Sequence, residues 1–188
     1  HLVQDVLEYF AGRERNYHLV ANLQNGPHTL EGMDFPIIDR IMTEERAREF
    51  YRQIHFLSDF QELDKEAVIK MSIVVDEEQT SSVTQRINQD FAGRLNAVTS
   101  GYGAIDLLPR GIHKGWGLRS LMERWKIEAD QIMAFGDSEN DLEMLELAGY
   151  SFAMENGEEK VKRMAKYIAP SNNEAGVLQV LEQYLKER

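Results

Sequence analysis

The sequence predicts an α/β protein in two parts: an α/β unit with an antiparallel sheet over residues 1–108, and half of a parallel α/β unit over residues 109–188. Two observations predict this division. In the first part helices and strands come in an uneven order, and residues 67–75 alternate between apolar and polar side chains, which is typical of a strand with one face in water. From residue 111 onward strands alternate with helices, as in βαβ units with a parallel sheet.

In the first part, apolar side chains at helical spacing predict a helix over residues 2–10. Thr43 fits the N-cap of a helix through Leu57, because its hydroxyl can accept a hydrogen bond from the first helical turn. We expect this helix and another over residues 76–91 to cover the same face of the sheet. The strands of that sheet are predicted at 17–23, 67–75, 95–99 and 104–108.

In the second part, an apolar stripe at i, i+3, i+4 and i+7 predicts a helix over residues 114–126. Residues 131–136 are almost wholly apolar, as in a buried parallel strand. About three parallel strands are predicted, whereas a sheet usually has ~5–6, and an open edge must pair with something. This part is therefore predicted to be half of a domain. Its other elements are helices at 140–148, 158–166 and 174–185 and strands at 150–154 and 167–169.

The composition limits the partners. The 188 residues include 21 Lys and Arg against 32 Asp and Glu, for a net charge of −11, and both parts are acidic. We therefore expect no nucleic-acid partner and no membrane partner. Cysteine is absent, which excludes disulfides, thiolate nucleophiles and Cys-based zinc sites and fits a cytoplasmic location. No apolar run approaches the ~20 residues of a membrane helix.

The most informative segment joins the predicted strand 131–136 to the next helix. Asp137 follows the strand directly, and ligands bind at the carboxyl ends of strands in open parallel sheets. Asp141 lies four residues on, where it can face the same crevice. Two carboxylates, with oxygens from Ser138 and Asn140, suit a hard cation such as Mg2+. The alternative is that these side chains only cap a helix, because acids are common in a first turn.

Lys114 begins a predicted helix, at the end where the helix dipole disfavours a cation. Gly115 and Gly117 stand in the same turn, and each weakens a helix by ~1 kcal/mol relative to Ala. This pattern favours a Lys114 that faces an anion such as phosphate, with glycines that allow close approach. The alternative is a solvated lysine after a flexible loop. Because Lys114, Asp137 and Asp141 all begin helices of one βαβ series, we expect them to converge on one pocket.

Other conspicuous residues have simpler explanations. His113, beside the lysine, is expected to be solvated. The acids at 76–78 begin a predicted helix, where acidic side chains are normal. Trp116, Trp125 and Phe135 are expected to lie in the core.

Together these residues resemble a known family. Lys114-Gly115 and the segment 135–145, FGDSENDLEML, are similar to motifs III and IV of the haloacid dehalogenase (HAD) superfamily, and the fit is best to its Cof-type phosphatases. The segments AMENG at 153–157 and SNNEAGV at 171–177 resemble the stretch that follows motif IV in those proteins. The resemblance implies half of a HAD-like parallel Rossmannoid core, preceded by an α/β cap that selects the substrate.

The resemblance also implies an activity. The chain resembles Mg2+-dependent hydrolases that act as phosphatases on small phosphorylated metabolites such as sugar phosphates. In them an Asp nucleophile of an Asp-x-Asp motif attacks phosphorus, and a metal and a lysine stabilise the charge. The resemblance implies that Asp137 holds Mg2+, that Asp141 supports the metal directly or through water, and that both act in catalysis with Lys114. Lys114 would neutralise phosphate charge, and Asn140 would hold Lys114 or the substrate phosphate.

No Asp-x-Asp occurs in the 188 residues. The resemblance places this motif on a strand before the cap, so we expect that the chain lacks that segment and alone is an inactive fragment. The segment, or another chain, would be a partner that completes the sheet. One alternative is a non-catalytic, regulatory module that binds metal or phosphate without the nucleophile. Another is a phosphoacceptor signalling domain, which is disfavoured because its lysine usually follows its acids along the chain.

Overall fold

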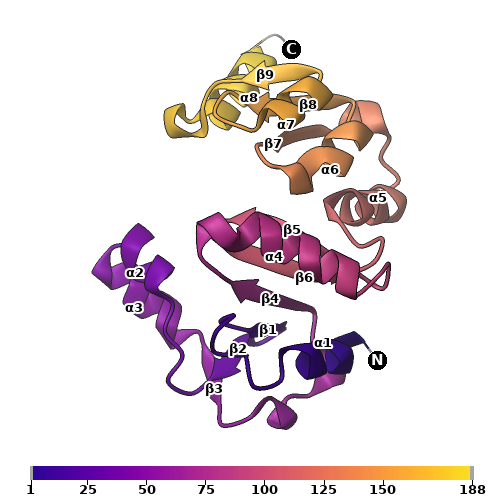
Figure 1. Ribbon diagram of the computed structural model, residues 1–188. Coiled ribbons are helices and arrows are strands. Elements are labelled where there is room, and N and C mark those ends of the chain that lie inside the picture. The colour runs from indigo at the N-terminus through magenta and orange to yellow at the C-terminus, as the bar shows by residue number, and fades with distance from the viewer. Residues whose placement is uncertain (1, 187–188) are drawn as a thin grey trace. The chain divides into compact units, whose positions relative to one another are not determined.

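A computed structural model describes residues 2–186, and of residues 39–41 only the backbone. The chain forms two compact units, one up to Arg110 and one from Gly111 onward (Figure 1). One unit holds a largely antiparallel sheet and the other a parallel sheet, so the predicted α/β fold class is confirmed. In the described range no helix has the length and apolar character that a membrane span requires.

The first unit is built on a six-stranded sheet in the order β3-β2-β1-β4-β6-β5. Neighbouring strands are antiparallel except for β2 and β3, which are parallel. The strands are β1 (Val20–Leu23), β2 (Gly26–Leu30), β3 (His55–Leu57), β4 (Lys70–Val74), β5 (Leu95–Gly101) and β6 (Ala104–Pro109).

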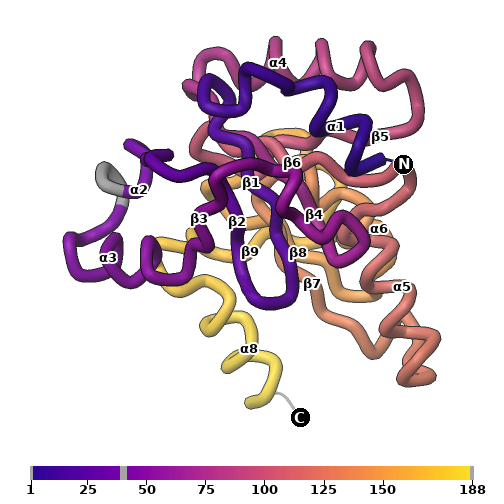
Figure 2. The backbone as a smooth tube through the Cα atoms, turned by 90° about the horizontal axis from the view of Figure 1, so that it is seen from below, coloured from indigo at the N-terminus to yellow at the C-terminus, as the bar shows by residue number. Residues whose placement is uncertain are grey.

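Helices α1 (Leu2–Phe10) and α4 (Glu77–Asp90) lie on the same face of this sheet (Figure 2). Phe10 of α1, Ile87 of α4 and Ile73 of β4 belong to one buried cluster. The alternating pattern of β4 explains this packing, because every second side chain of a strand points to the same face. This cluster is the main core of the first unit.

Helices α2 (Pro36–Ile41) and α3 (Glu44–Arg52) pack on the opposite face, around a second buried cluster that contains Phe35. In β1, Ala21 belongs to the first cluster and its neighbour Val20 packs against the second. The prediction that α3 shares a face with α4 is therefore wrong. The reason is that β2 and β3 are parallel, and parallel strands need a crossover connection, which α2 and α3 supply.

The sequence prediction also misses β2 and β3. Thr43 caps α3 as predicted, since its Oγ1 accepts a hydrogen bond from the Arg46 amide at 3.5 Å. The helix ends at Arg52, however, because residues 55–57 pair with β2. Pro27 lies inside β2 and has no amide hydrogen to donate, so the sequence around it resembles a turn rather than a strand.

The second unit has a three-stranded parallel sheet in the order β7-β8-β9, with helices as the connections. Ala134, Leu145 and Val161 lie in its buried cluster, which joins β7 to the two connecting helices. The strands are β7 (Met133–Gly136), β8 (Tyr150–Met154) and β9 (Tyr167–Ala169), and the helices are α5 (Lys114–Trp125), α6 (Leu142–Leu147), α7 (Glu159–Met164) and α8 (Gly176–Lys186).

Large apolar side chains of the second unit are left uncovered. The rings of Phe135, Phe152 and Tyr167 stack across the three strands, with centroids 5.0 and 5.1 Å apart. The two phenylalanines are half-buried, and Tyr167 is 49% exposed. Trp116 is 51% exposed and Trp125 is 61% exposed, so the prediction that they lie in the core is wrong, and Phe135 is half-buried. The helix of both tryptophans, α5, packs through Leu118 and other residues on only one side.

Tyr9 provides a pH test of the packing between α1 and α4. Its hydroxyl donates a hydrogen bond to the Asp90 carboxylate at 2.6 Å. Partial burial, followed by this bond, raises the pKa of Tyr9 from 10.0 to about 12. Because the folded pKa is raised, the stabilisation is complete below pH 10 and is lost as the pH rises to about 12.

We therefore expect the difference in free energy of unfolding between the wild type and Tyr9→Phe to be constant below pH 10 and to shrink between pH 10 and 12. Tyrosinate absorbance should show one tyrosine fewer titrating near pH 12 in the variant. A wild-type Tyr9 that ionises at the ordinary tyrosine value would contradict this packing.

Candidate functional site

The polar side chains that follow β7 come together around the buried carboxylate of Asp141, which is 3% exposed. Its Oδ2 accepts hydrogen bonds from the backbone amides of Asp137 at 3.0 Å and Ser138 at 3.2 Å. Its Oδ1 accepts a hydrogen bond from the Lys114 ammonium. One oxygen of the Asp141 carboxylate thus binds the loop after β7, and the other binds Lys114, the first residue of α5.

Lys114 makes a second contact in the same place. Its Nζ donates to Oδ1 of Asn140 at 3.1 Å, and the Ser138 hydroxyl donates to the same oxygen at 2.9 Å. The Lys114 side chain is 48% exposed, so its ammonium is fixed from one side and open to solvent on the other. The structure therefore brings Lys114, Asn140 and Asp141 into contact, with a positive charge facing outward.

Glycines allow these elements to approach closely. A Cβ at Gly136 would lie 2.5 Å from the Asp141 Cβ, so a side chain there would displace the carboxylate. A Cβ at Gly115 would lie 2.7 Å from the Cβ of Glu143, so this glycine lets α5 approach α6. Gly115 serves helix packing rather than contact with an anion, whereas Gly117 faces open space.

Asp137 lies at the carboxyl end of β7 and is held by its backbone. Its carbonyl oxygen accepts a hydrogen bond from the Glu158 amide at 2.9 Å, and a Cβ at Gly157 would lie 3.0 Å from the Asp137 Cα. Within residues 2–186, no hydrogen bond or ion pair engages the Asp137 carboxylate. The backbone is fixed while the carboxylate is available to a ligand.

His113 has a role that sequence reasoning missed. Its Nδ1 accepts a hydrogen bond from the Trp116 amide at 3.2 Å, and it is the N-cap of α5. The expectation of a merely solvated histidine is wrong in this respect. Its position immediately before the helix was the available signal, since a side-chain acceptor there can satisfy a free amide of the first turn.

The helix-capping alternative also holds for part of the site. Ser138 and Asp141 form a reciprocal capping box around η4 (Glu139–Asp141), the short helix that leads into α6. Capping alone does not explain why Lys114 comes from another helix to meet both Asn140 and Asp141. The loop is therefore capped and, in addition, positions a cation.

The donor set can be compared with what Mg2+ needs. No group of three or more His, Cys, Asp or Glu side chains suited to a metal occurs in the part of the chain that the structure describes. Mg2+ takes few protein ligands and keeps several waters, so one free carboxylate such as that of Asp137 fits it. Asp141, with both oxygens engaged, fits a supporting role better than direct ligation.

The sequence matches the family of haloacid dehalogenase-like hydrolases over residues 3–181. The chain belongs to this family. The resemblance found in the sequence is thereby confirmed at the level of the superfamily. None of the matches tests the roles of Lys114, Asp137, Asn140 and Asp141, which stay predictions.

Several relatives of the chain are named phosphatases. The chain is 35% identical over 168 residues to 5-amino-6-(5-phospho-D-ribitylamino)uracil phosphatase YbjI of Escherichia coli, covering 89% of this chain and 59% of that protein. It is 31% identical over 147 residues to a phosphoglycolate phosphatase of Methanosarcina acetivorans, covering 74% and 62% of the two chains. The chain therefore spans about three fifths of the length of these relatives.

Solved structures agree with this assignment. SMU.1108c from Streptococcus mutans is 32% identical, with a TM-score of 0.77 over 97% of this chain and 68% of that one. A haloacid dehalogenase-like hydrolase from Bacteroides thetaiotaomicron is 27% identical, with a TM-score of 0.73 over 96% and 66%. A HAD/COF-like hydrolase from Plasmodium vivax, 21% identical, shares the fold with a TM-score of 0.81 over 98% and 63%.

The two acids of the loop should differ in their effect on stability. Asp141→Ala leaves two amides and Lys114 without their acceptor, so we expect it to lower the free energy of unfolding by about 1–3 kcal/mol. Asp137→Ala removes a carboxylate with no partner and should change it by less than about 0.5 kcal/mol. Chemical denaturation followed by tryptophan fluorescence measures this, because both tryptophans, Trp116 and Trp125, lie in the second unit. Equal losses for the two variants would show that Asp141 does not organise the loop.

Proposed function

We propose that this chain carries the metal-binding and phosphate-binding part of a Mg2+-dependent phosphatase that acts on small phosphorylated metabolites. The observation that carries the proposal is the placement of the Lys114 ammonium. It is held by Asp141 and Asn140 in the same loop that presents the free carboxylate of Asp137. Phosphoryl transfer depends mainly on positioning and on charge stabilisation, and this arrangement offers groups for both.

Each residue then has a separate task. Lys114 neutralises charge on the substrate phosphate, and Asn140 holds the ammonium at 3.1 Å. Asp137 would hold Mg2+, which supplies Lewis-acid stabilisation of the phosphoryl oxygens when bound. Asp141 positions Lys114 and the loop amides from its buried site.

The substrate class rests on the relatives. Two relatives that match most of this chain are named for phosphatases of small organic phosphates, one a ribitylaminouracil phosphate and one phosphoglycolate. Their names support a small phosphorylated metabolite, with sugar phosphates and sugar-alcohol phosphates as the first compounds to test. A cytoplasmic location stays a prediction.

The nucleophile is assigned to a segment outside these residues. The 188 residues contain no Asp-x-Asp motif, and the chain spans 59% of the E. coli relative. In this assignment Lys114 neutralises the phosphate charge and Asp137 holds the metal, and the attack on phosphorus is left to an Asp-x-Asp residue outside these residues. The proposal therefore requires a further segment, or another chain, to complete the site.

An open sheet edge and exposed apolar side chains in the second unit support such a partner. In the described residues β7 is at the edge of its sheet and pairs with β8 only. Leu178 and Leu185 of α8 are exposed, the second by 72%, as is Trp125 of α5. Open strand edges are usually covered in stable proteins. A segment that pairs with β7 would add strands to the sheet.

The test uses a longer protein, which begins upstream in the encoding gene and includes the strand with the Asp-x-Asp motif. We expect the extended protein to hydrolyse phosphomonoesters in a reaction that a chelator abolishes. Lys114→Ala should lower kcat/KM by about 10²–10³, the usual effect of removing one charge-stabilising donor. Asp137→Asn should raise the Mg2+ concentration needed for half-maximal rate by at least about tenfold.

Lys162→Ala is the matched control, because Lys162 is a lysine of the same unit that pairs with Glu159 at 3.0 Å instead of with the site. It should leave the rate unchanged. The 188-residue chain alone should show no turnover, and chelator-sensitive turnover by it would place the nucleophile within these residues. An extended protein inactive across a broad panel of phosphomonoesters would favour a regulatory module that binds phosphate or metal.

A further inference from the structure

The loop that follows β8 packs against the backbone of Asp137. Gly157 lies in this loop, and a Cβ built on it would be 3.0 Å from both the Cα and the carbonyl oxygen of Asp137. The next residue, Glu158, donates its amide to the same carbonyl oxygen at 2.9 Å. The direction in which the Asp137 side chain leaves the end of β7 therefore depends on where residues 155–158 lie.

One side chain joins this loop to the loop that follows β9. Oδ1 of Asn156 accepts a hydrogen bond from the Ser171 hydroxyl at 3.1 Å and a second one from the Asn172 amide at 3.0 Å. The strand pairing of β8 with β9 ends at Met154 and Ala169, before both loops begin. Asn156 thus continues the connection between the two loops after the strands have ended.

The loop after β9 is a firm anchor for Asn156. The carbonyl oxygen of Ser171 accepts hydrogen bonds from the amides of Glu174 at 3.0 Å and Gly176 at 3.1 Å. A Cβ at Gly176 would lie 1.9 Å from the Pro170 carbonyl oxygen, so the loop closes on itself too tightly for a side chain at this position. Ser171 is therefore held by its own loop, and its bond to Asn156 restrains the loop after β8.

Asn156 is exposed, and a simpler explanation is that it only caps the short helix η5 (Asn172–Glu174). A side-chain acceptor that meets the first amide of a helix is a common cap. A cap alone, however, does not require a position next to Gly157, which packs on Asp137. The two explanations differ in what they predict for the backbone of Asp137 when Asn156 is changed.

We propose that Asn156 is a positioning residue for Asp137. By joining the loops after β8 and β9, it fixes the backbone from which the Asp137 carboxylate would reach Mg2+. Asn156 acts only through that backbone and contacts neither metal nor substrate. The inference deepens the proposed function and rests on it for the role of Asp137 as a metal ligand. The mechanical link from Asn156 to Asp137 is measurable without that role.

The first measurement is amide hydrogen exchange of the 188-residue chain without metal, followed by NMR. Asn156→Ala removes the acceptor and frees residues 155–158, so we expect the Glu158 amide to exchange about fivefold faster, as when one ordinary hydrogen bond is lost. Asn156→Asp keeps an oxygen that can accept both bonds. In this variant the exchange of Glu158 should stay within about twofold of the wild type.

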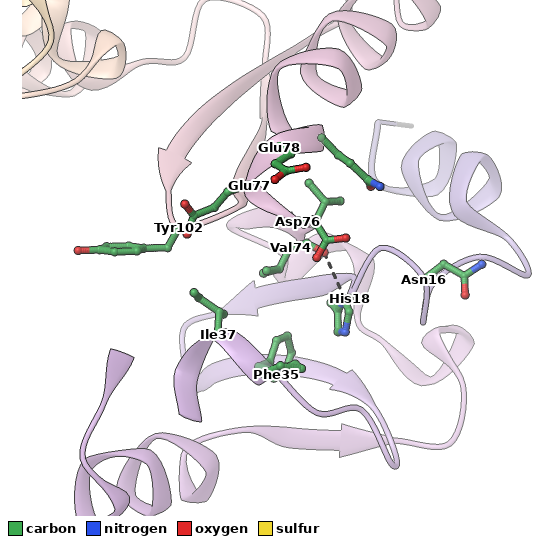
Figure 3. A pocket seen from close by; sticks show the side chains of 12 residues that line it. Asn16, His18, Phe35, Ile37, Val74, Asp76, Glu77, Glu78 and Tyr102 are labelled. Atoms are coloured by element: carbon green, nitrogen blue, oxygen red, sulfur yellow. Dashed lines mark hydrogen bonds between the residues drawn. The ribbon is translucent and has the colours of Figure 1, made fainter. Parts of the chain in front are cut away.

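Two control variants remove comparable links in the first unit. Asn88 accepts a hydrogen bond from the Ala97 amide at 2.8 Å and donates one to the Ala97 carbonyl oxygen at 3.0 Å, so Asn88→Ala is the matched change. Nδ1 of His18 lies 3.2 Å from the Val74 carbonyl oxygen beside a cavity of about 630 Å3 (Figure 3), and His18→Ala removes this contact. Neither control should change the exchange of Glu158.

The second measurement is Mn2+ binding to the extended protein, followed by the electron paramagnetic resonance signal of free Mn2+, with Mg2+ as competitor. Asn156→Ala should raise the Kd about three- to fivefold. This is less than the ~10-fold or more expected when a group bonded directly to a metal ligand is lost, because Asn156 acts through the loop. Asn156→Asp should not weaken binding, and Asp137→Asn should weaken it more than Asn156→Ala does.

Unchanged exchange of Glu158 in Asn156→Ala would overturn the proposal. Equal effects of the alanine and aspartate variants would also overturn it, because the Oδ1 acceptor would then not be the group that matters. If Asp137→Asn weakens Mn2+ binding and Asn156→Ala does not, this inference fails while the proposed function stands. If Asp137→Asn binds Mn2+ as the wild type does, the proposed metal site itself fails.

Discussion

The arrangement of the second unit depends on one buried carboxylate. Asp141 accepts two backbone amides through one oxygen and the Lys114 ammonium through the other. A buried charge is costly unless it is paired and hydrogen-bonded. Lys114 supplies the opposite charge, and the amides of Asp137 and Ser138 supply the hydrogen bonds. These bonds to Asp141 fix the loop after β7 and join it to α5. They also hold Lys114 at the N-terminus of α5, where the helix dipole disfavours a cation.

That contact in turn depends on the absence of side chains nearby. Gly136 leaves the space that the Asp141 side chain fills, and Gly115 lets α5 come close enough for Lys114 to reach it. Gly157 packs against Asp137 from the loop after β8, where the Glu158 amide holds the Asp137 carbonyl. The Asp137 carboxylate thus makes no hydrogen bond or ion pair among the described residues, whereas the backbone of the same loop is hydrogen-bonded to Asp141 and to the Glu158 amide. This is the arrangement expected of a loop that receives a charged ligand.

The sequence predicted the parallel unit well because its elements are local and regular. The predicted strands at 150–154 and 167–169 agree with β8 and β9. The positions of Lys114, Asp137 and Asp141 predicted that the three residues share one crevice, and the structure brings Lys114 and Asp141 into direct contact. The six-stranded sheet of the first unit was harder to predict from the sequence. Strand β2 contains Pro27, and β3 has three residues, so neither carries enough local signal.

Other features could not be inferred from the sequence because they depend on contacts between distant residues. The face that α3 covers follows from the parallel pairing of β2 with β3, and the exposure of Trp125 follows from packing on one side of α5. The cavity beside Asp76 brings together four segments between residues 16 and 102. The pattern at 76–78 indicated only the beginning of a helix.

A crystal structure of the chain extended upstream, with Mg2+ and tungstate as a phosphate mimic, tests the central claim most directly. The account predicts the Lys114 ammonium within about 3.2 Å of a tungstate oxygen while it stays bound to Asp141, with the Asp137 carboxylate at the metal. Tungstate and Mg2+ bound away from the loop after β7, with Lys114 still directed into solvent, would contradict it.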